Sequence, residues 1–285
     1  MNYLSYLTLI VVLFCSNPAS SQSGWVREAK GLYIQTALTT FSSNEYYSTS
    51  GQLFDDGSTF NSRGLLLYGE YGITDRFTAL LDVPLVMLNS FSSTETVAGV
   101  GDVKLGVKYQ LIKSFPLALQ IDFSIPTDDG TKLSDAKEPN SIGIIEQINL
   151  PTSDGEFNVW TTLAVSQSTA NGKTFGSLYG RVNFRTQSFS HQLQAGLEIG
   201  HLFFNKLYLI GKLGIQEKLS SELNQGGSFL YGEGTTFTSA GITAIYKLST
   251  NWRLVATVSD YNEWIIARRN IYDGLTFSLG IALEY

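Results

Sequence analysis

The chain has 285 residues, of which 43% are hydrophobic, 13% aromatic and only 15% charged. Ordinary soluble domains carry about 25% charged residues. The high aromatic and aliphatic content excludes a disordered chain. The net charge of −6 gives no basic surface of the kind that nucleic-acid binding requires, so we expect no nucleic-acid partner.

The first residues, 1–21, have the pattern of a secretory signal peptide. They carry no charged side chain, and an apolar run over 7–15 precedes the small residues Ala19 and Ser21, which suit cleavage. The run is too short for a spanning helix, which needs about 20 apolar residues. We therefore expect export and a single domain over 22–285. A lipid anchor on Cys15 is the alternative, and the bulky Phe14 before it argues against that anchor.

Cysteine usage narrows the function classes. Cys15 is the only cysteine and lies inside the expected signal peptide. The mature chain therefore has no disulfide scaffold, no cysteine metal cluster and no thiol catalysis. An exported chain of this kind is a periplasmic protein, a secreted protein or an outer-membrane barrel.

Segments in which apolar and polar residues alternate recur along the whole mature chain. This period of two is typical of strands with two different faces. Many segments reach the roughly 9–11 residues with which a tilted strand crosses a bilayer, and single-chain bacterial barrels have an even number of strands. We predict twelve strands, at 31–43, 62–73, 76–88, 99–112, 115–126, 156–168, 174–187, 190–203, 205–218, 234–248, 251–262 and 274–285.

The segment 115–125, FPLALQIDFSI, shows the alternation clearly, with Gln120, Asp122 and Ser124 opposite an apolar face. A soluble sheet would bury the apolar face, whereas a membrane barrel would turn it towards lipid. Backbone groups in hydrocarbon must all be paired, so strands span a membrane only as a closed barrel. We predict an all-β fold, namely a closed antiparallel transmembrane β-barrel of about 12 strands in the outer membrane of a Gram-negative bacterium.

The connections between the predicted strands differ in length. Short ones, expected to face the periplasm, lie near 72–76, 111–114, 203–206 and 248–251, and long extracellular loops are expected at 44–61, 89–98, 127–155, 219–233 and 263–273. The segment 141–150 has strand propensity, but a thirteenth strand would break the even count. We place it in the third long loop, as a hairpin above the membrane.

Aromatic residues gather beside the short turns and mostly fall on the apolar face. Tyrosine and tryptophan favour the level where a ring meets both lipid and water, so these residues predict a girdle around the barrel. In a soluble sandwich they would be rim aromatics. The residues are Tyr71, Phe77, Tyr109, Phe115, Phe203, Tyr208, Tyr246, Trp252 and Tyr285.

Charged residues of both signs fall on the polar face of the predicted strands. An Arg or Lys that faces lipid at mid-depth costs about 2–4 kcal/mol, so these side chains must point into the barrel. A twelve-stranded barrel is wider than the eight-stranded kind that side chains fill. An open or gated path is therefore expected, with a lumen filled by ion pairs as the alternative. The predicted lumen-lining residues are Glu70, Asp82, Asp102, Lys104, Lys108, Asp122, Arg181, Arg185, Glu198, Lys212 and Arg253.

The last segment, GLTFSLGIALEY, alternates to the end of the chain and finishes on Tyr285. It resembles the C-terminal signal by which bacterial outer-membrane barrels are recognised for assembly. The usual last residue is Phe. The expected partners are therefore the lipid bilayer, the barrel-assembly machinery and a small-molecule solute that the sequence does not identify.

The stretch GVGDVKLGVKYQL, 99–111, resembles the G-x-G-D-x-x-x-G-x-K-Y strand of the outer-membrane barrel proteins named for the meta-pathway of phenol degradation. The matching residues are Gly99, Gly101, Asp102, Gly106, Lys108 and Tyr109. The later GLEIGHLFFNKLYLIGKLG resembles a strand–turn–strand of the same family. The resemblance implies a porin-like channel for small hydrophobic or aromatic compounds, without defined site residues. The stretch is not a phosphate loop, because a strand rather than a helix follows it.

Enzyme chemistry has little support in the residues. A lipase-type barrel needs a serine beside a histidine, and the only histidines are His191 and His201. Ser190 adjoins His191, but neighbours on a strand point to opposite faces. A protease barrel would draw on loop acids such as Asp55–Asp56 and Asp128–Asp129, which are also the residues for a weak Ca²⁺ site.

We therefore expect no enzyme activity, no cofactor and no metal. The predicted function is passive uptake or efflux of small molecules through a lumen narrowed by loop 127–155, with the inward charges setting the local field. The main alternative is a structural or surface-binding barrel whose lumen is blocked. A barrel lipase or protease is the third candidate.

Overall fold

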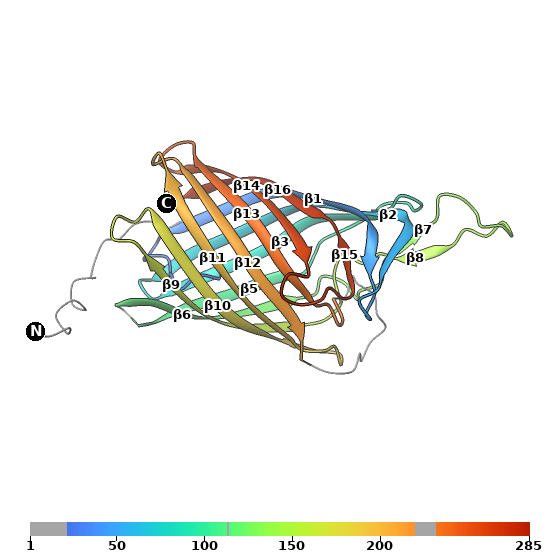
Figure 1. Cartoon of the computed structure of the whole chain (residues 1–285), viewed down its shortest axis with the longest axis horizontal. Coiled ribbons are helices and arrows are strands. Elements are labelled where there is room, and N and C mark those ends of the chain that lie inside the picture. The colour runs from blue at the N-terminus through green and yellow to red at the C-terminus, as the bar shows by residue number, and fades with distance from the viewer. Residues whose placement is uncertain (1–21, 113, 220–231) are drawn as a thin grey trace, which may run out of the picture.

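The chain forms a closed antiparallel β-barrel of twelve strands (Figure 1). The computed structural model describes residues 22–112, 114–219 and 232–285. Strand β1 pairs with β2 on one side and with β16 on the other, so the first and last strands of the sequence close the sheet. Closure pairs the backbone groups of every barrel strand and leaves no open sheet edge. The predicted fold class is confirmed.

The barrel strands follow one another around the sheet in chain order. Short strands also lie in the connections: β4 (Val97–Gly99), β7 (Leu133–Asp135), β8 (Gln147–Asn149) and β15 (Ile271–Asp273). The barrel strands are β1 (Leu32–Tyr47), β2 (Leu53–Thr74), β3 (Phe77–Phe91), β5 (Val103–Ile112), β6 (Phe115–Ile125), β9 (Asn158–Ser168), β10 (Thr174–Arg185), β11 (Gln192–Phe203), β12 (Leu207–Lys218), β13 (Phe237–Lys247), β14 (Trp252–Asn262) and β16 (Leu275–Glu284).

The two ends of the barrel differ. The turn end carries the connections 75–76, 169–173, 204–206 and 248–251 and residue 114, together with the start of β1 and the end of β16 (Figure 1). The loop end carries the connections 48–52, 92–102, 126–157, 186–191 and 263–274, together with residues 219 and 232–236. No helix in the described part of the chain has the length and apolar character needed to cross a membrane.

The outer face of the barrel is apolar. Large hydrophobic side chains on the strands are exposed there, including Ile242 and Leu279 at 57% each. Their strand neighbours alternate to the inner face, as the period of two requires. On β16, for example, Gly280 and Ala282 are buried inside the barrel between exposed apolar residues.

The predicted strands are found at their expected places, and the two largest differences in extent are at the loop end. Strands β1 and β2 continue past the predicted ends and pair as far as Tyr47 and Leu53, so most of the expected loop 44–61 is a long hairpin. The predicted strand 99–112 is interrupted at 100–102. There the backbone N–H of Gly101 donates to the carbonyl of Pro84 at 2.9 Å, outside the regular ladder.

The connection between β6 and β9 contains a small hairpin rather than a thirteenth barrel strand. Strand β7 pairs with β8 through Leu133↔Asn149 and Asp135↔Gln147. This two-stranded unit is separate from the barrel sheet and projects beyond the loop end (Figure 1). The segment 141–150 therefore forms the tip and the returning arm of this hairpin, as its placement in the third loop predicted.

The predicted aromatic girdle lies on the outer face at the turn end, with one exception. Tyr208 points into the barrel, where it is 5% exposed and packs in an apolar cluster. Its prediction was wrong because sequence alternation alone does not distinguish an aromatic in lipid from one in a filled lumen. Outward-facing members include Tyr71, Phe77, Phe115, Phe203, Tyr246, Trp252 and the terminal Tyr285, each at least 38% exposed.

Candidate functional site

The interior of the barrel is the candidate site, and the cross-strand register places the predicted charged residues in three layers along it. Three of these residues lie at the turn end, six in the middle and two at the loop end. The turn-end residues are Glu70, Lys108 and Arg253; the middle residues are Asp82, Lys104, Asp122, Arg181, Glu198 and Lys212; the loop-end residues are Asp102 and Arg185.

The middle of the barrel contains open space. Lys104 lies opposite Asp82, with 3.9 Å between Nζ and Oδ2, and the side chains are 46% and 40% exposed although they face inward. Lys212 lies 3.8 Å from Glu198 and is also 46% exposed. Side chains with this accessibility inside a barrel border solvent rather than a packed core.

Other charges of the middle layer are held against the wall. Gln120 donates to both oxygens of Asp122, at 2.9 and 2.7 Å. The Asp122 carboxylate lies over Gly106, where an added Cβ would come within 2.0 Å of it. The guanidinium of Arg181 stacks on Trp160 at 4.2 Å and donates to Gln194 at 2.6 Å. Because both side chains are held against the wall, neither the Asp122 carboxylate nor the Arg181 guanidinium occupies the centre of the lumen at this level.

The turn end is crossed by the N-terminal segment, residues 22–30, of which 22–27 lie inside the barrel and 28–30 are exposed at its rim. The backbone N–H of Gly24 donates to Ser166 Oγ on β9 at 2.7 Å. Lys108 Nζ on β5 donates to the Trp25 carbonyl at 3.4 Å, and the Arg27 N–H donates to Thr78 Oγ1 on β3 at 2.8 Å. The segment therefore runs across the lumen between walls that are distant in the sheet.

Arg27 fixes one end of the N-terminal segment through buried ion pairs. Its guanidinium lies 2.8 Å from Glu70 on β2 and 2.7 Å from Glu284 on β16. Arg253 on β14 adds a contact to Glu284 at 3.2 Å. The four side chains are 5–13% exposed, so the pairs are little screened by solvent.

An apolar cluster fills the rest of the turn end. The Trp25 ring meets Phe175 edge-on, with 5.8 Å between centroids. Gly200 provides space beside Phe175, since an added Cβ would come within 2.3 Å of the Phe175 ring. The N-terminal segment and this cluster together close the turn end with side chains. The buried members are Tyr33, Phe175, Tyr208, Ile210, Ile245, Val255 and Ala282.

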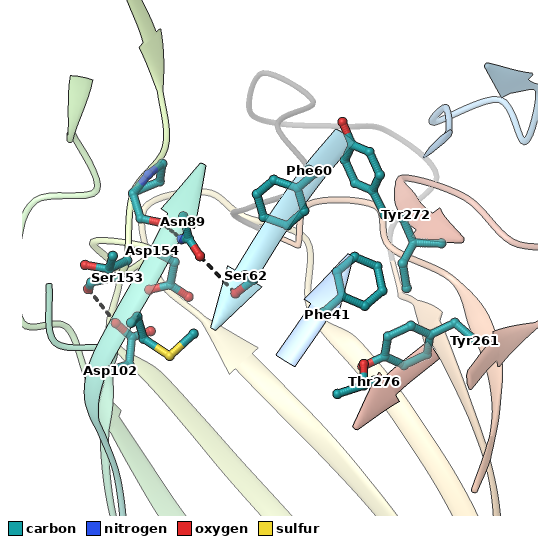
Figure 2. A pocket seen from close by; sticks show the side chains of 14 residues that line it. Phe41, Phe60, Ser62, Asn89, Asp102, Ser153, Asp154, Tyr261, Tyr272 and Thr276 are labelled. Carbon is teal, nitrogen blue, oxygen red and sulfur yellow. Dashed lines mark hydrogen bonds between the residues drawn. The ribbon is translucent and has the colours of Figure 1, made fainter. Parts of the chain in front are cut away.

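A cavity of about 370 Å³ lies inside the loop end. Figure 2 shows the aromatic rings of Phe41, Phe60 and Tyr272 on one side of it, with Asp102 and Asp154 on the other. The two carboxylates come from the connections before β5 and β9, and the rings come from β1, β2 and β15. The cavity therefore has an apolar side and an acidic side.

Asp102 lies in the connection between β4 and β5, outside the strands, and belongs to an acidic pair. Ser153 Oγ donates to Asp102 Oδ1 at 2.5 Å. Burial, followed by the like charge of Asp154, raises the pKa of Asp102 to about 7, although the positive charge of Lys104 acts in the opposite direction. A protonated Asp102 can share a hydrogen bond with Asp154, whereas an ionised one is repelled by it.

This pKa predicts that segment 151–154 holds its position against Asp102 less firmly as the pH rises. A loop that has moved away returns Asp102 to its ordinary pKa of 3.8, so the docked loop binds more protons. Its docking is fully favoured below that ordinary value and is lost as the pH rises through about 7. Amide hydrogen exchange at 152–155 should therefore be faster at pH 8 than at pH 6, after correction for the intrinsic pH dependence of exchange.

The matched variant Asp102→Asn removes the titrating group and keeps the side-chain size. We expect it to show the same exchange rate at both pH values after correction for the intrinsic pH dependence of exchange. Equal corrected rates in the unaltered protein would contradict the role assigned to Asp102.

Arg185 anchors a second buried network at the loop end. Its guanidinium contacts Glu156, which precedes β9, and lies 3.8 Å from Glu233. It also donates to the carbonyl of Gly232 at 3.1 Å. Ser190 donates to Glu233 through its backbone N–H at 2.9 Å and through its hydroxyl at 2.6 Å. This network holds segment 232–236 inside the loop end.

The residues considered for enzyme chemistry serve other contacts. Ser190 donates to Glu233 rather than to His191, and His191 Nδ1 accepts from the Arg185 N–H at 3.1 Å. His201 Nδ1 lies 2.7 Å from Thr174 Oγ1. Asp55 lies in β2 rather than in a loop, and Asp128 pairs with Lys132 at 3.4 Å. In the described part of the chain, no group of three His, Cys, Asp or Glu side chains is placed to hold a metal ion.

The structure shows two features of the site that were not predicted: the N-terminal segment and the aromatic side of the cavity. Trp25 and Arg27 follow the expected cleavage point and belong to no alternating segment. One signal in the sequence was available. A tryptophan and an arginine follow the expected cleavage point, and the start of a closed barrel lies close to the inward acidic residues of the neighbouring strands. The expected signal peptide, 1–21, lies outside the described residues.

No protein-family model matches the chain, and no curated protein matches it. Among solved structures, an outer-membrane channel from Pseudomonas putida F1 is similar at a TM-score of 0.65 and 14% identity, over 94% of this chain and 100% of that one. The translocator domain of the autotransporter NalP from Neisseria meningitidis is similar at a TM-score of 0.55 and 12% identity, over 92% and 91%. The CymD monoaromatic hydrocarbon channel is similar at 0.51 and 7%, over 90% and 89%. These likenesses place the fold among outer-membrane β-barrels.

Proposed function

We propose that this protein is an outer-membrane channel through which small molecules diffuse passively. The observation that carries the proposal is the solvent-accessible middle layer, where Lys104, Asp82 and Lys212 face inward yet are 40–46% exposed. The accessible charges of this layer then line the pathway, and the buried charges at the two ends hold the segments that narrow it. The accessible charges set the field along it rather than perform chemistry.

The apolar outer face supports placement in a bilayer, with the turn end towards the periplasm. The outward aromatic residues at that end fit the interface between lipid and water. Export by a signal peptide over 1–21 and assembly through the C-terminal strand ending in Tyr285 complete the proposal. Both rest on the sequence pattern.

The proposed solutes are small hydrophobic or aromatic compounds. The rings along one side of the loop-end cavity provide an apolar contact surface for such a solute. The resemblance of 99–109 to the phenol-degradation barrel family supports the same solute class. CymD, whose fold is similar, is a channel for monoaromatic hydrocarbons.

A planar-bilayer recording tests the channel directly. We expect the refolded mature protein to give discrete conductance steps, and Lys212→Glu to increase the preference for cations because it reverses an inward charge. Lys137→Glu, which changes an exposed residue of the projecting hairpin, is the control. Folded protein that gives no steps, even after release of the N-terminal segment, would contradict the proposal.

The filled turn end favours a second candidate, a structural or surface-binding barrel with a blocked lumen. In that case the N-terminal segment and the apolar cluster are permanent parts of the core. The two candidates differ in one measurement, because only the channel gains conductance when the segment is released.

A further inference from the structure

The loop-end cavity has an apolar side and an acidic side that lie opposite each other. One side presents Phe60, Tyr272 and Phe41, of which the first two are 4% exposed. Phe60 and Tyr272 lie 5.2 Å apart between ring centroids. The opposite side presents the Asp102 and Asp154 carboxylates (Figure 2). A ligand that satisfies both sides needs an apolar body and a group that interacts with two carboxylates.

Two of the polar residues between the two sides, Asn89 and Ser62, are already hydrogen-bonded within the wall. Asn89 accepts from Ser62 Oγ at 2.9 Å and donates to the Pro151 carbonyl at 2.9 Å. The Asn89 side chain is therefore fixed in the cavity wall, between the aromatic rings and the two carboxylates. The charged residues that line the cavity are Asp102 and Asp154.

The lysines near the acidic side have other carboxylate partners. Lys104 is paired with Asp82, and Lys132 is paired with Asp128 at 3.4 Å. Asp154 accepts from the Glu156 N–H at 3.0 Å and from Asn158 Nδ2 at 3.3 Å, and both of these donors are neutral. A bound cation would relieve the repulsion between the two carboxylates that Lys104 only partly offsets.

We propose that the loop-end cavity binds a small ligand with a protonated amine and an aromatic body, its ammonium between Asp102 and Asp154 and its ring against Phe60, Tyr272 and Phe41. This deepens the proposed function and rests on it for the biological role, since the cavity lies in the proposed pathway. A volume of about 370 Å³ is at the small end for ligand pockets and suits a single ring with a short aliphatic arm.

Three probes of similar size, each a phenyl ring with a short arm, test the ligand class in the folded mature protein. They are 2-phenylethylamine, which is protonated at neutral pH, 2-phenylethanol, which is neutral, and phenylacetate, which is an anion. Binding is measured by calorimetry in detergent micelles, with empty micelles as the partition reference. We expect the amine to bind at least about tenfold more tightly than the alcohol and the anion to show no saturable binding.

The charge preference should depend on the two acids. Asp102→Asn with Asp154→Asn should remove the advantage of the amine over the alcohol, whereas Asp135→Asn, which changes an exposed acid in the hairpin, should leave it intact. In the unaltered protein, amine binding should tighten between pH 6 and pH 8 because the Asp102 carboxyl loses its proton over this range. Heat-dependent mobility in SDS gels verifies that each variant is folded.

Equal affinity for the amine and the alcohol, or tighter binding of the anion, would overturn the proposal with the unaltered protein alone, so it does not depend on any variant folding. An unchanged preference in the double variant would also overturn it. These measurements need no transport. A barrel that binds the amine but never conducts would support the proposed binding site and contradict the proposed channel. A barrel that conducts but shows no preference for the amine would support the channel and contradict the binding site.

Discussion

Replacing Trp25 and Arg27 together by alanine is expected to turn a channel that opens only in discrete steps into one that conducts continuously. Arg27 joins Glu70 and Glu284 across the turn end, and Trp25 packs on Phe175 in the apolar cluster. The double variant removes these two side-chain attachments, leaves the barrel strands unchanged and keeps the backbone hydrogen bonds of the segment to Ser166, Lys108 and Thr78. The N-terminal segment should then leave the lumen.

The magnitude follows from the buried charges. Breaking a buried ion pair by removing one partner costs about 3–5 kcal/mol, and each 1.4 kcal/mol is about a tenfold change in an equilibrium constant. The ratio of docked to released segment should therefore fall by at least roughly a hundredfold. Loss of the Trp25 contact adds to this effect, although neighbouring substitutions are not strictly additive.

Planar-bilayer conductance is the readout, with the fraction of time in the open state as the measured quantity. Lys173→Ala is the matched control, because it removes an exposed cation from a turn at the same end of the barrel. If the double variant is folded and conducts no more than the control, then the N-terminal segment does not close the pathway.

The strand positions were predictable because successive residues of a barrel strand face lipid and lumen in turn. The sequence of such a strand therefore alternates between apolar and polar residues. On β6, Phe123 faces outward at 41% exposure while Asp122 and Ser124 are buried inside. This information is local, so a short window of sequence contains it. The same reasoning assigned the inward charges, because an outward charge would face lipid.

The closure of the turn end was not predictable in this way. Arg27 and Glu284 are separated by 257 positions in the sequence, and the N-terminal segment has no alternation that marks its surroundings. The contact depends on the closed barrel bringing the start of the chain beside the end of β16. Only the folded sheet contains that relation.

The loop-end cavity could not be predicted from the sequence for a different reason. Phe60 and Tyr272 point inward at the loop end, as Tyr208 does at the turn end. An aromatic residue suits lipid, an interface and a filled interior equally well, so its type does not reveal its face. Asp102 was assigned to the inner face, but its pairing with Asp154 required the position of loop 126–157.

Replacing Arg185 by methionine is expected to destabilise the barrel more than any other single substitution considered for the loop end. Glu156 and Glu233 are both 0% exposed and lie on either side of the Arg185 guanidinium. Methionine fills similar space but provides no charge, so two carboxylates would remain buried without this cation. Ser190 would still donate to Glu233, but Glu156 would lose its ionic partner.

We expect a loss of about 3–5 kcal/mol in the free energy of unfolding, measured by urea titration in lipid vesicles with tryptophan fluorescence. Arg63→Met, which changes an exposed arginine on β2, should alter the stability by less than about 0.5 kcal/mol. Adding Glu156→Gln and Glu233→Gln to the Arg185→Met variant should recover part of the loss, since neutral groups are cheaper to bury than unpaired charges. A methionine variant as stable as the unaltered protein would show that segment 232–236 is held in place without the ion pairs.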